Sequence, residues 1–418
     1  MSTDFRRRIH DFIAARFDDQ CAFLAALVET PSDNPPGNCA AHAERAAGLL
    51  EGLGFTVERH PVPPELVTDN GMISVTNLIV RQRFGEGPVI ALNAHGDVVP
   101  PGEGWTYDPY GAEIVDGKMY GRGVAVSKSD FATYSFALLA LIDAGAPLGG
   151  TVELHFTHDE ETGGAIGPQW LLEQGISSPD YALSAGFSHG VVTHHNGCLH
   201  LEVVMSGKSA HAARPDTGHD ALEAASSVLA ALYGERQSYE SIKSQIDGID
   251  SPTLVVGLIE GGINTNVVPD AVRFRLDRRI IPEEDAAAVE DRLREVIGGA
   301  AAAHDRISCA VRRIMLATPF LPVPGSEVLS DALLRNGAAV LGETIAAHGV
   351  PLYTDARFYA NAGIPTAIYG AGPRSLLDAN AHRADERLVL DDLRSATEVV
   401  ALTLLDLLHG GPSYTKDQ

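Results

Sequence analysis

The fold is decided by the stretch Val89-Ile90-Ala91-Leu92-Asn93-Ala94-His95-Gly96-Asp97. Residues 89–94 are almost all apolar, which is typical of a strand buried inside a parallel sheet. His95 and Asp97 follow at the carboxyl end of that strand, where open α/β sheets form their sites. A histidine with an aspartate two residues later can ligate a metal while the carboxylate orients the imidazole. A hydrogen-bonded pair within a core is the alternative interpretation.

A second predicted strand, Thr151–Thr157, also leads into polar residues, the three consecutive acids Asp159, Glu160 and Glu161. Adjacent carboxylates repel one another unless a cation or a shared proton offsets their charge. At such a strand end, one carboxylate can bind a metal while its neighbour activates water. A solvated acidic loop is the alternative. His382, near the end of the chain, is in isolation more typical of a structural histidine.

Strand-like apolar segments alternate with helical patterns through most of the chain. This alternation predicts an α/β fold whose mostly parallel sheet carries helices on both faces. Helical patterns over residues 5–30 and 39–53 come first. Strands are expected at 77–83, 89–94, 151–157, 181–184 and 366–369, and helices at 131–144, 167–174, 327–341 and 388–408.

The pattern changes after Gly197 to the order β-α-β-β-α-β, which is the ferredoxin-like arrangement. We therefore predict a discontinuous catalytic domain, residues 1–198 and 316–418, that is interrupted by an inserted α+β lid domain over 199–315. Residues 234–248 are expected to be a loop. The strands of the insert are expected at 199–206, 253–260, 271–278 and 306–314, and its helices at 219–233 and 282–297.

Charge and composition restrict the class of protein. The 418 residues include 31 basic and 55 acidic side chains, and the net charge of −24 argues against nucleic acid or an anionic membrane as a partner. No apolar run approaches the length of a membrane span, and no signal peptide is recognisable. The four cysteines are scattered, as is typical of reduced thiols, so we expect a cytoplasmic protein.

Longer motifs resemble a known family. Residues 104–111 (Gly-Trp-Thr-Tyr-Asp-Pro-Tyr-Gly) and 116–123 (Asp-Gly-Lys-Met-Tyr-Gly-Arg-Gly) resemble the zinc aminoacylase and acetylornithine deacetylase family of metallopeptidases. That family also includes succinyl-diaminopimelate desuccinylase and the glutamate carboxypeptidases. The resemblance covers most of the chain, with the insert where the family has its lid. Further matches are Gly207–His211, Asn266–Pro269, Asp277–Asp285, Ile364–Thr366 and Gly370–Gly372.

The resemblance implies a role for each matching residue. His95 matches a metal ligand, and Asp97 matches the acid that orients it. Glu160 matches the general base that takes a proton from metal-bound water, and Glu161 and His382 match ligands of a second metal. His211 matches the lid histidine that polarises the scissile carbonyl, usually in the partner subunit's site. The positions that contact the substrate's carboxylate end are matched by Asn266, Arg279 and Gly372.

The sequence departs from the family at two ligand positions. The family motif G-R-G-x-x-D-x-K contains an aspartate that bridges two metals, and Val126 stands at that position here. A second acidic ligand is replaced by Ala185. Two divalent cations would then repel each other without the anions that normally offset their charge. The nearby side chains with donor atoms that could replace these ligands are Asp130, His189, His194 and His195.

We therefore predict one divalent metal per site, held by His95, Glu161 and His382, and this ligand set suits Zn, Mn, Co or Fe. The predicted reaction is hydrolysis of a C–N bond in a small carboxylate-bearing substrate by metal-bound water that Glu160 activates. An amide is the family default. An aromatic amine stays open, because the two lost ligands leave an apolar space.

The alternative function is that of a catalytically silent homologue that binds a small molecule or a partner in the same cleft. The retained Glu160 argues against it, because a binding protein has little need of a desolvated base. The resemblance also implies a homodimer or a higher homo-oligomer, in which His211 of one chain reaches the site of another.

Overall fold

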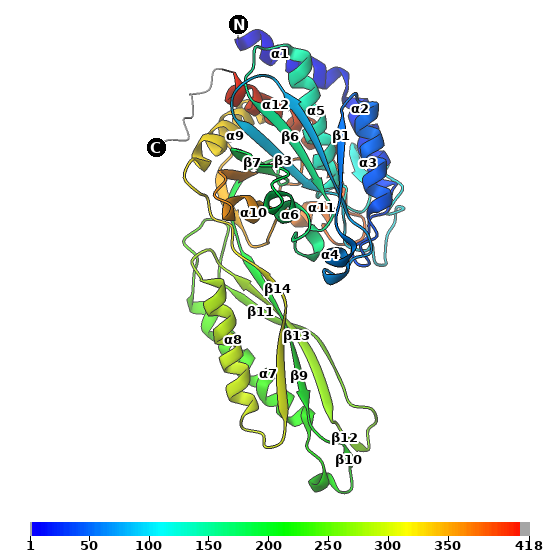
Figure 1. Cartoon of the computed structure of the whole chain (residues 1–418), viewed down its shortest axis with the longest axis vertical. Helices are drawn as coiled ribbons and strands as arrows, with labels where there is room; N and C mark the ends of the chain where they lie inside the picture. Colours follow the sequence, from blue (N-terminus) through cyan, green and yellow to red (C-terminus); the bar gives the residue numbers. More distant parts are fainter. Residues whose placement is uncertain (1, 410–418) are drawn as a thin grey trace. The chain divides into compact units, whose positions relative to one another are not determined.

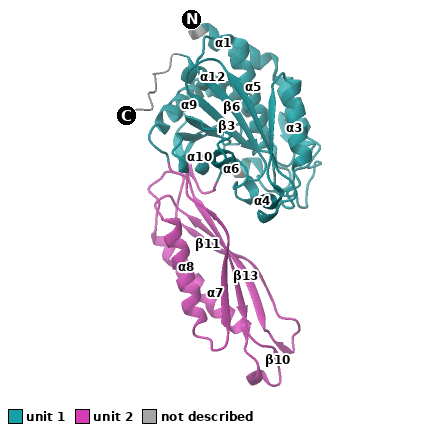
Figure 2. Ribbon diagram, in the orientation of Figure 1, with its two compact units in different colours: residues 1–193, 322–348, 354–418 teal, residues 194–321, 349–353 magenta. Residues whose placement is uncertain are grey.

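The structure, a computed structural model, describes residues 2–409 and divides into two compact units (Figure 2). Unit 1 contains the residues up to 193, residues 322–348 and those from 354 onward. Unit 2 contains residues 194–321 and 349–353. The predicted domain boundaries, 198/199 and 315/316, lie a few residues from these divisions. The sequence gives no sign that segment 349–353 belongs with unit 2.

Unit 1 is built on an eight-stranded mixed sheet (Figure 1). Its centre consists of parallel strands, because β3 pairs in parallel with both β6 and β7, and β7 pairs in parallel with β16. Antiparallel strands lie outside this centre. The order across the sheet is β1 (Val57–Pro61), β2 (Thr76–Arg83), β6 (Thr151–Thr157), β3 (Val89–His95), β7 (Tyr181–Ser184), β16 (Thr366–Ile368), β8 (Val191–His195) and β15 (Ala347–Val350).

Helices cover both faces of this sheet, which confirms the predicted fold class. Ile90 and Leu92 of β3 belong to the main core on one face, whereas Ala91 packs with Tyr359 on the other, as the alternation of a strand requires. The main core includes α1 (Ser2–Ala15), α2 (Phe17–Val28), α3 (Ala40–Gly52), α5 (Lys128–Ala144), α9 (Ser326–Leu341) and α12 (Leu390–Leu408), and the opposite face carries α6 (Pro168–Glu173) and α10 (Ala356–Asn361).

Unit 2 is a four-stranded antiparallel sheet with two helices on one face (Figure 1). The elements follow one another in the predicted β-α-β-β-α-β order. The strand order is β11 (Thr253–Gly261), β13 (Ala271–Ile280), β9 (Gly197–Ser206) and β14 (Ser308–Ala317), and the helices are α7 (Ala221–Ser238) and α8 (Ala286–Ala301).

Two sequence expectations are corrected. Residues 5–30 form two helices rather than one, because the backbone of Arg16 leaves the helical region at φ −107° and ψ 11°. The apolar pattern continues across that break and so could not signal it. Residues 234–238 belong to α7 rather than to a loop, since helical hydrogen bonding tolerates their polar side chains on an exposed face.

Within residues 2–409 the structure contains no helix with the length and apolar character that crossing a bilayer requires.

Small elements complete the fold. Unit 1 also has α4 (Pro64–Asp69), α11 (Leu376–Ala379) and a three-stranded sheet of β4 (Glu113–Val115), β5 (Lys118–Tyr120) and β17 (Arg387–Val389), and unit 2 has β10 (Ala210–His211) paired with β12 (Val267–Val268).

Candidate active site

The carboxyl ends of β3 and β6 bring the two predicted polar groups together. His95, the last residue of β3, lies opposite Thr157 at the end of β6. The three acids follow one residue after β6, and Glu160–Thr162 forms a single 3-10 turn. The edge of the sheet therefore presents an imidazole and neighbouring carboxylates to the same space, as parallel pairing of adjacent strands requires.

Asp97 fastens these two strand ends to each other. Its Oδ1 accepts the N–H of Glu160 at 3.2 Å, and its Oδ2 accepts the N–H of Glu161 at 3.1 Å and the side-chain amide of Asn34 at 2.9 Å. Nδ1 of His95 lies 3.0 Å from the carbonyl oxygen of Asp97 and 3.4 Å from Oδ1. Since both neighbours of Nδ1 are acceptors, Nδ1 carries a proton and Nε2 is the atom that faces the acids.

His95, Glu160 and Glu161 form a compact group of metal-ligand atoms, with one atom from each within 4.8 Å of the others. Burial raises the pKa of the Glu160 carboxyl to about 8; His95 opposes that rise, and Glu161 adds to it. Burial alone would lower the pKa of His95, but its hydrogen bond to Asp97 and the charge of Glu160 hold that pKa well above the usual value. The raised pKa values mean that His95 and Glu160 hold protons more tightly than usual, and a bound cation would compete with those protons.

His382, between α11 and β17, lies outside this compact group but contacts one of its members, Glu161. Its Nε2 lies 3.6 Å from Oε1 of Glu161, and this interaction raises the pKa of His382. The side chain is 66% exposed, so it meets the buried acid from the solvent side. Its φ of 62° is uncommon for a residue with a side chain, and such strained backbone is frequent where a ligand is held.

The structure places apolar side chains at the two altered ligand positions. Oγ of Ser127 accepts the N–H of His95 at 2.9 Å, so the turn that carries Val126 is held against the end of β3. Ala185 follows β7, and its N–H donates to the carbonyl of Asn93 in β3 at 2.8 Å. Both positions are therefore fixed beside the sheet edge, and neither supplies an electron pair.

Asp130 is a buried structural acid rather than a member of the ligand group. Its Oδ1 accepts the N–H of Ala371 at 2.7 Å, and an added Cβ on Gly370 would lie 2.2 Å from the same oxygen. Burial raises the pKa of Asp130 to about 7. The carboxyl group thus supports the turn after β16.

The histidines considered as replacements have other partners. His189 is held by Glu343 at 3.2 Å and by Asp392 at 3.0 Å, one at each ring nitrogen. His194 and His195 belong to unit 2, and Nδ1 of His195 lies 2.8 Å from the carbonyl oxygen of Asn196. None of the three belongs to a group of metal-ligand atoms found among the described residues.

Asp355 is a site residue that the sequence analysis missed. It precedes α10, is 2% exposed, and within residues 2–409 its two carboxylate oxygens have no hydrogen-bond partner. Burial raises the pKa of Asp355 to about 7, and the charge of Glu160 adds to that rise. Gly164 makes room for it, since an added Cβ there would lie 2.2 Å from Oδ1. In sequence nothing distinguishes Asp355 from other polar loop residues.

A buried ion pair fixes the loop before Val126. Nη1 of Arg122 donates to Oε2 of Glu386 at 2.5 Å, and the N–H of Ala125 donates to Oε1 at 3.2 Å. Both charged side chains are almost fully buried. Separating such a pair would leave an uncompensated buried charge, which is costly. The pair therefore holds the loop in the conformation that keeps the two charges together.

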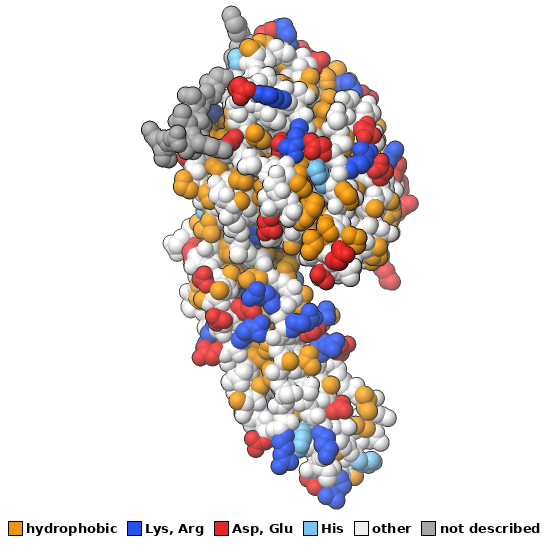
Figure 3. All heavy atoms as spheres, viewed as in Figure 1, with side chains coloured by type: hydrophobic (Ala, Val, Ile, Leu, Met, Phe, Trp, Pro, Cys, Tyr) orange, Lys and Arg blue, Asp and Glu red, His pale blue; other side chains and the backbone are white. Residues whose placement is uncertain are grey.

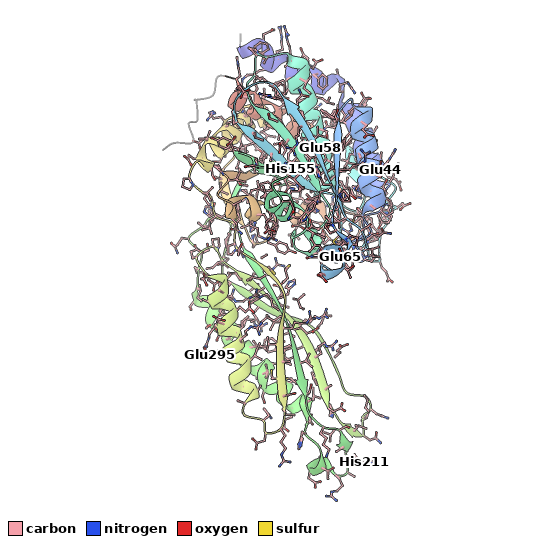
Figure 4. All side chains as sticks on the ribbon, in the orientation of Figure 1. Glu44, Glu58, Glu65, His155, His211 and Glu295 are labelled. Atoms are coloured by element: carbon pink, nitrogen blue, oxygen red, sulfur yellow. The ribbon has the colours of Figure 1, made fainter. Side chains whose placement is uncertain are left out.

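The residues predicted to contact substrate lie in both units. Gly372, in unit 1, donates its N–H to the carbonyl of Gly186 at 2.7 Å. Nε of Arg279, in unit 2, donates to Oδ1 of Asp277 at 3.1 Å. His211 and Asn266 are exposed on and beside the small β10–β12 ribbon of unit 2, and Figure 4 labels His211 there. Their roles stay predictions.

The donor set at the β3–β6 edge fits a divalent metal. Imidazole and carboxylate ligands suit the cations named above, and the raised pKa of Glu160 and the two unpartnered carboxylate oxygens of Asp355 show that nearby positive charge is lacking, which a cation would supply. An α/β sheet with such a group at its strand ends and a separate ferredoxin-like unit defines a metal-dependent hydrolase.

The chain belongs to peptidase family M20/M25/M40, whose sequence model matches residues 91–406. It is 29% identical to a succinyl-diaminopimelate desuccinylase from Gluconobacter oxydans, over 84% of this chain and 88% of that one. Its fold is similar to that of human carnosine dipeptidase 1, with a TM-score of 0.74, 16% identity and coverage of 96% and 98% of the two chains. It is also similar to a dinuclear metal-binding peptidase of the M20 family from Bacillus subtilis, with a TM-score of 0.65, 19% identity and coverage of 94% and 99%.

Proposed function

We propose that the protein hydrolyses a C–N bond, by default an amide, in a small substrate that bears a carboxylate. The observation that carries this proposal is the position of Glu160, whose carboxylate is only 12% exposed and has Oε2 4.0 Å from Nε2 of His95. A desolvated carboxylate beside a group of metal-ligand atoms is suited to accept a proton from water. It can then return that proton to the nitrogen that leaves.

His95, Glu161 and His382 would hold the cation. When bound, a divalent cation supplies Lewis-acid chemistry, lowering the pKa of water and polarising the carbonyl. Asp97 keeps the proton on Nδ1 of His95, so that Nε2 is presented as the ligand atom. Asp97 also accepts hydrogen bonds from the N–H groups of Glu160 and Glu161, and these bonds fix the positions of the base and the ligand relative to His95.

One cation per site is the proposed count. Val126 and Ala185 stand where the family supplies anionic ligands. The candidate replacements Asp130, His189, His194 and His195 all lie outside the group of metal-ligand atoms. A second cation would meet the first without an anion between them.

Crystals soaked in Zn²⁺ should therefore give a single anomalous peak at this site. Val126→Asp restores a bridging carboxylate and should add a second peak, whereas the isosteric control Val126→Thr should not. Two peaks at the β3–β6 edge of the unaltered protein would contradict the single-cation proposal.

The substrate class is inferred from the relatives and from the altered site. One relative is named for removing a succinyl group and the other for cleaving a dipeptide. We propose that Arg279, Asn266 and the backbone of Gly372 bind the substrate's carboxylate end. The apolar space beside Val126 keeps an aromatic amine as a second candidate substrate.

We expect turnover with a member of a panel of N-succinyl and N-acetyl amino acids, dipeptides and aryl amines. Mass spectrometry should detect products whose summed mass equals substrate plus water. Treatment with a chelator should abolish turnover, and re-addition of Zn²⁺, Mn²⁺ or Co²⁺ should restore it. Binding of panel members without turnover, at any metal loading, would favour the silent homologue.

We propose a homodimer formed through unit 2. Strand β11 is an edge of the four-stranded sheet, and an exposed edge invites pairing with another chain. Three of its apolar side chains are exposed, as is that of a residue that follows the strand, and such a patch marks a contact surface. The exposed residues are Val255, Leu258, Ile259 and Ile263, with exposed fractions of 52%, 62%, 55% and 78%.

A further inference from the structure

The sheet of unit 2 has one face without helices. Alternate residues of β9 pack beneath α7 and α8, and those between them, including Cys198 and His200, lie on the open face. Strand β13 pairs with β9 so that Asp277 lies opposite His200 and Arg279 lies opposite Cys198. Figure 3 shows basic and acidic side chains mixed on the surface of unit 2. The register thus assembles a thiol, an imidazole and a carboxylate on this face.

The three side chains converge on one point. Sγ of Cys198 lies 3.3 Å from Nε2 of His200 and 3.3 Å from Oδ2 of Asp277. Nε2 of His200 lies 2.8 Å from the same Oδ2. Each of the three ligand atoms therefore contacts both of the others.

This arrangement differs from that of a catalytic Cys-His-Asp relay. A relay places the acid on one ring nitrogen and the nucleophile on the other, so that a proton can pass across the imidazole. In this cluster Cys198 and Asp277 both contact Nε2 of His200. A triangle of sulfur, nitrogen and oxygen is instead the arrangement of three metal ligands.

We propose that Cys198, His200 and Asp277 bind a divalent transition-metal cation of the zinc and cobalt class, at a second site whose ligands differ from those proposed for the catalytic one. Tetrahedral zinc with sulfur, nitrogen and oxygen ligands holds those atoms about 3.3–3.6 Å apart, only slightly wider than the observed triangle. The side chains of His200 and Asp277 are 35% and 28% exposed, so solvent water can supply the fourth ligand.

Binding changes only the protons of this cluster. The Cys198 thiol releases its proton to solvent and binds as thiolate, and His200 binds through Nε2 with a proton on Nδ1. The thiolate and the Asp277 carboxylate together offset the two positive charges of the cation. Nε of Arg279 donates a hydrogen bond to Oδ1 of Asp277 at 3.1 Å, which leaves Oδ2 directed toward the other two ligands.

The test uses the full-length protein, freed of metal by a chelator and titrated with Co²⁺. Thiolate ligation to Co²⁺ gives a sulfur-to-metal charge-transfer band, and the proposed catalytic ligands contain no sulfur. We expect the band in the unaltered protein and its loss in Cys198→Ser, with one fewer bound cobalt per chain. Cys309→Ser is the matched control, because Cys309 lies in β14 of the same sheet, and it should retain the band.

His200→Ala provides a second variant that keeps the thiol. It should weaken Co²⁺ binding at this site by more than about 100-fold, since a lost ligand costs more than a lost supporting contact. Circular dichroism and thermal melting should show that both variants are folded. The proposal is overturned if the unaltered protein shows no charge-transfer band, or if the band persists in Cys198→Ser. Failure of the catalytic proposal would leave these spectra unchanged.

Discussion

Glu160→Gln should reduce kcat by about 10²–10⁴-fold, because the amide cannot accept the proton that the buried carboxylate takes from water. The two side chains have nearly the same shape, so packing and the hydrogen bonds of the turn should be preserved. The measurement is steady-state kinetics with the substrate found by the mass-spectrometric panel. Elemental analysis of the same samples should show an unchanged metal content.

Glu161→Gln is the matched control for that experiment, since it alters the adjacent carboxylate in the same turn. We expect it to lower metal occupancy, because Glu161 is the proposed ligand that also contacts His382 at 3.6 Å. The metal content of the two variants therefore distinguishes the general base, whose loss leaves metal binding unchanged, from the metal ligand, whose loss lowers it. Turnover of Glu160→Gln comparable to that of the unaltered enzyme would show that another group moves the proton.

Two inactive variants, Glu160→Gln and His211→Ala, should regain activity when their subunits are mixed. The N–H of Ala213 donates to Nδ1 of His211 at 3.1 Å, so the neutral ring carries its proton on Nε2 and can donate to a developing oxyanion. If His211 acts in the partner's site, a mixed dimer has one complete site. Random exchange of subunits should then restore about a quarter of full activity, since half of the dimers are mixed.

The mixture should be prepared by unfolding and refolding the two variants together, with each variant refolded alone as the control. His211→Ala by itself should lower kcat by about 10²–10³-fold, the usual cost of losing one oxyanion donor. Light scattering should report a dimer for every sample. A fully active monomer, or a mixture no more active than its parts, would show that His211 does not act in the partner's site.

Much of the fold and of the site could be predicted from local sequence patterns. The buried strand before His95, the strand before Glu160 and the β-α-β-β-α-β order of unit 2 all appear in the structure. These patterns are local, because hydrophobic periodicity is set by the geometry of each helix or strand. The absence of donors at Val126 and Ala185 also needed no coordinates, since neither side chain has an electron pair to offer.

Other features depend on contacts between distant parts of the chain. Asp355 becomes a neighbour of Glu160 only because Gly164 leaves space for its carboxylate. Cys198 and His200 are two residues apart, which predicts a shared face, but the register of β13 against β9 decides that Asp277 joins them. The break between α1 and α2 at Arg16 also could not be predicted from the sequence, because the apolar pattern continues across it.

The amino-acid sequence by itself determined the fold class, the family and the loss of two anionic ligands, because each of these is written in residue types and their local spacing. Only the tertiary structure decided which buried acid adjoins the base and which cross-strand side chains meet in unit 2. The reason is physical: burial and strand register arise from packing between segments far apart in the chain, and those set the charge and the distances at a site.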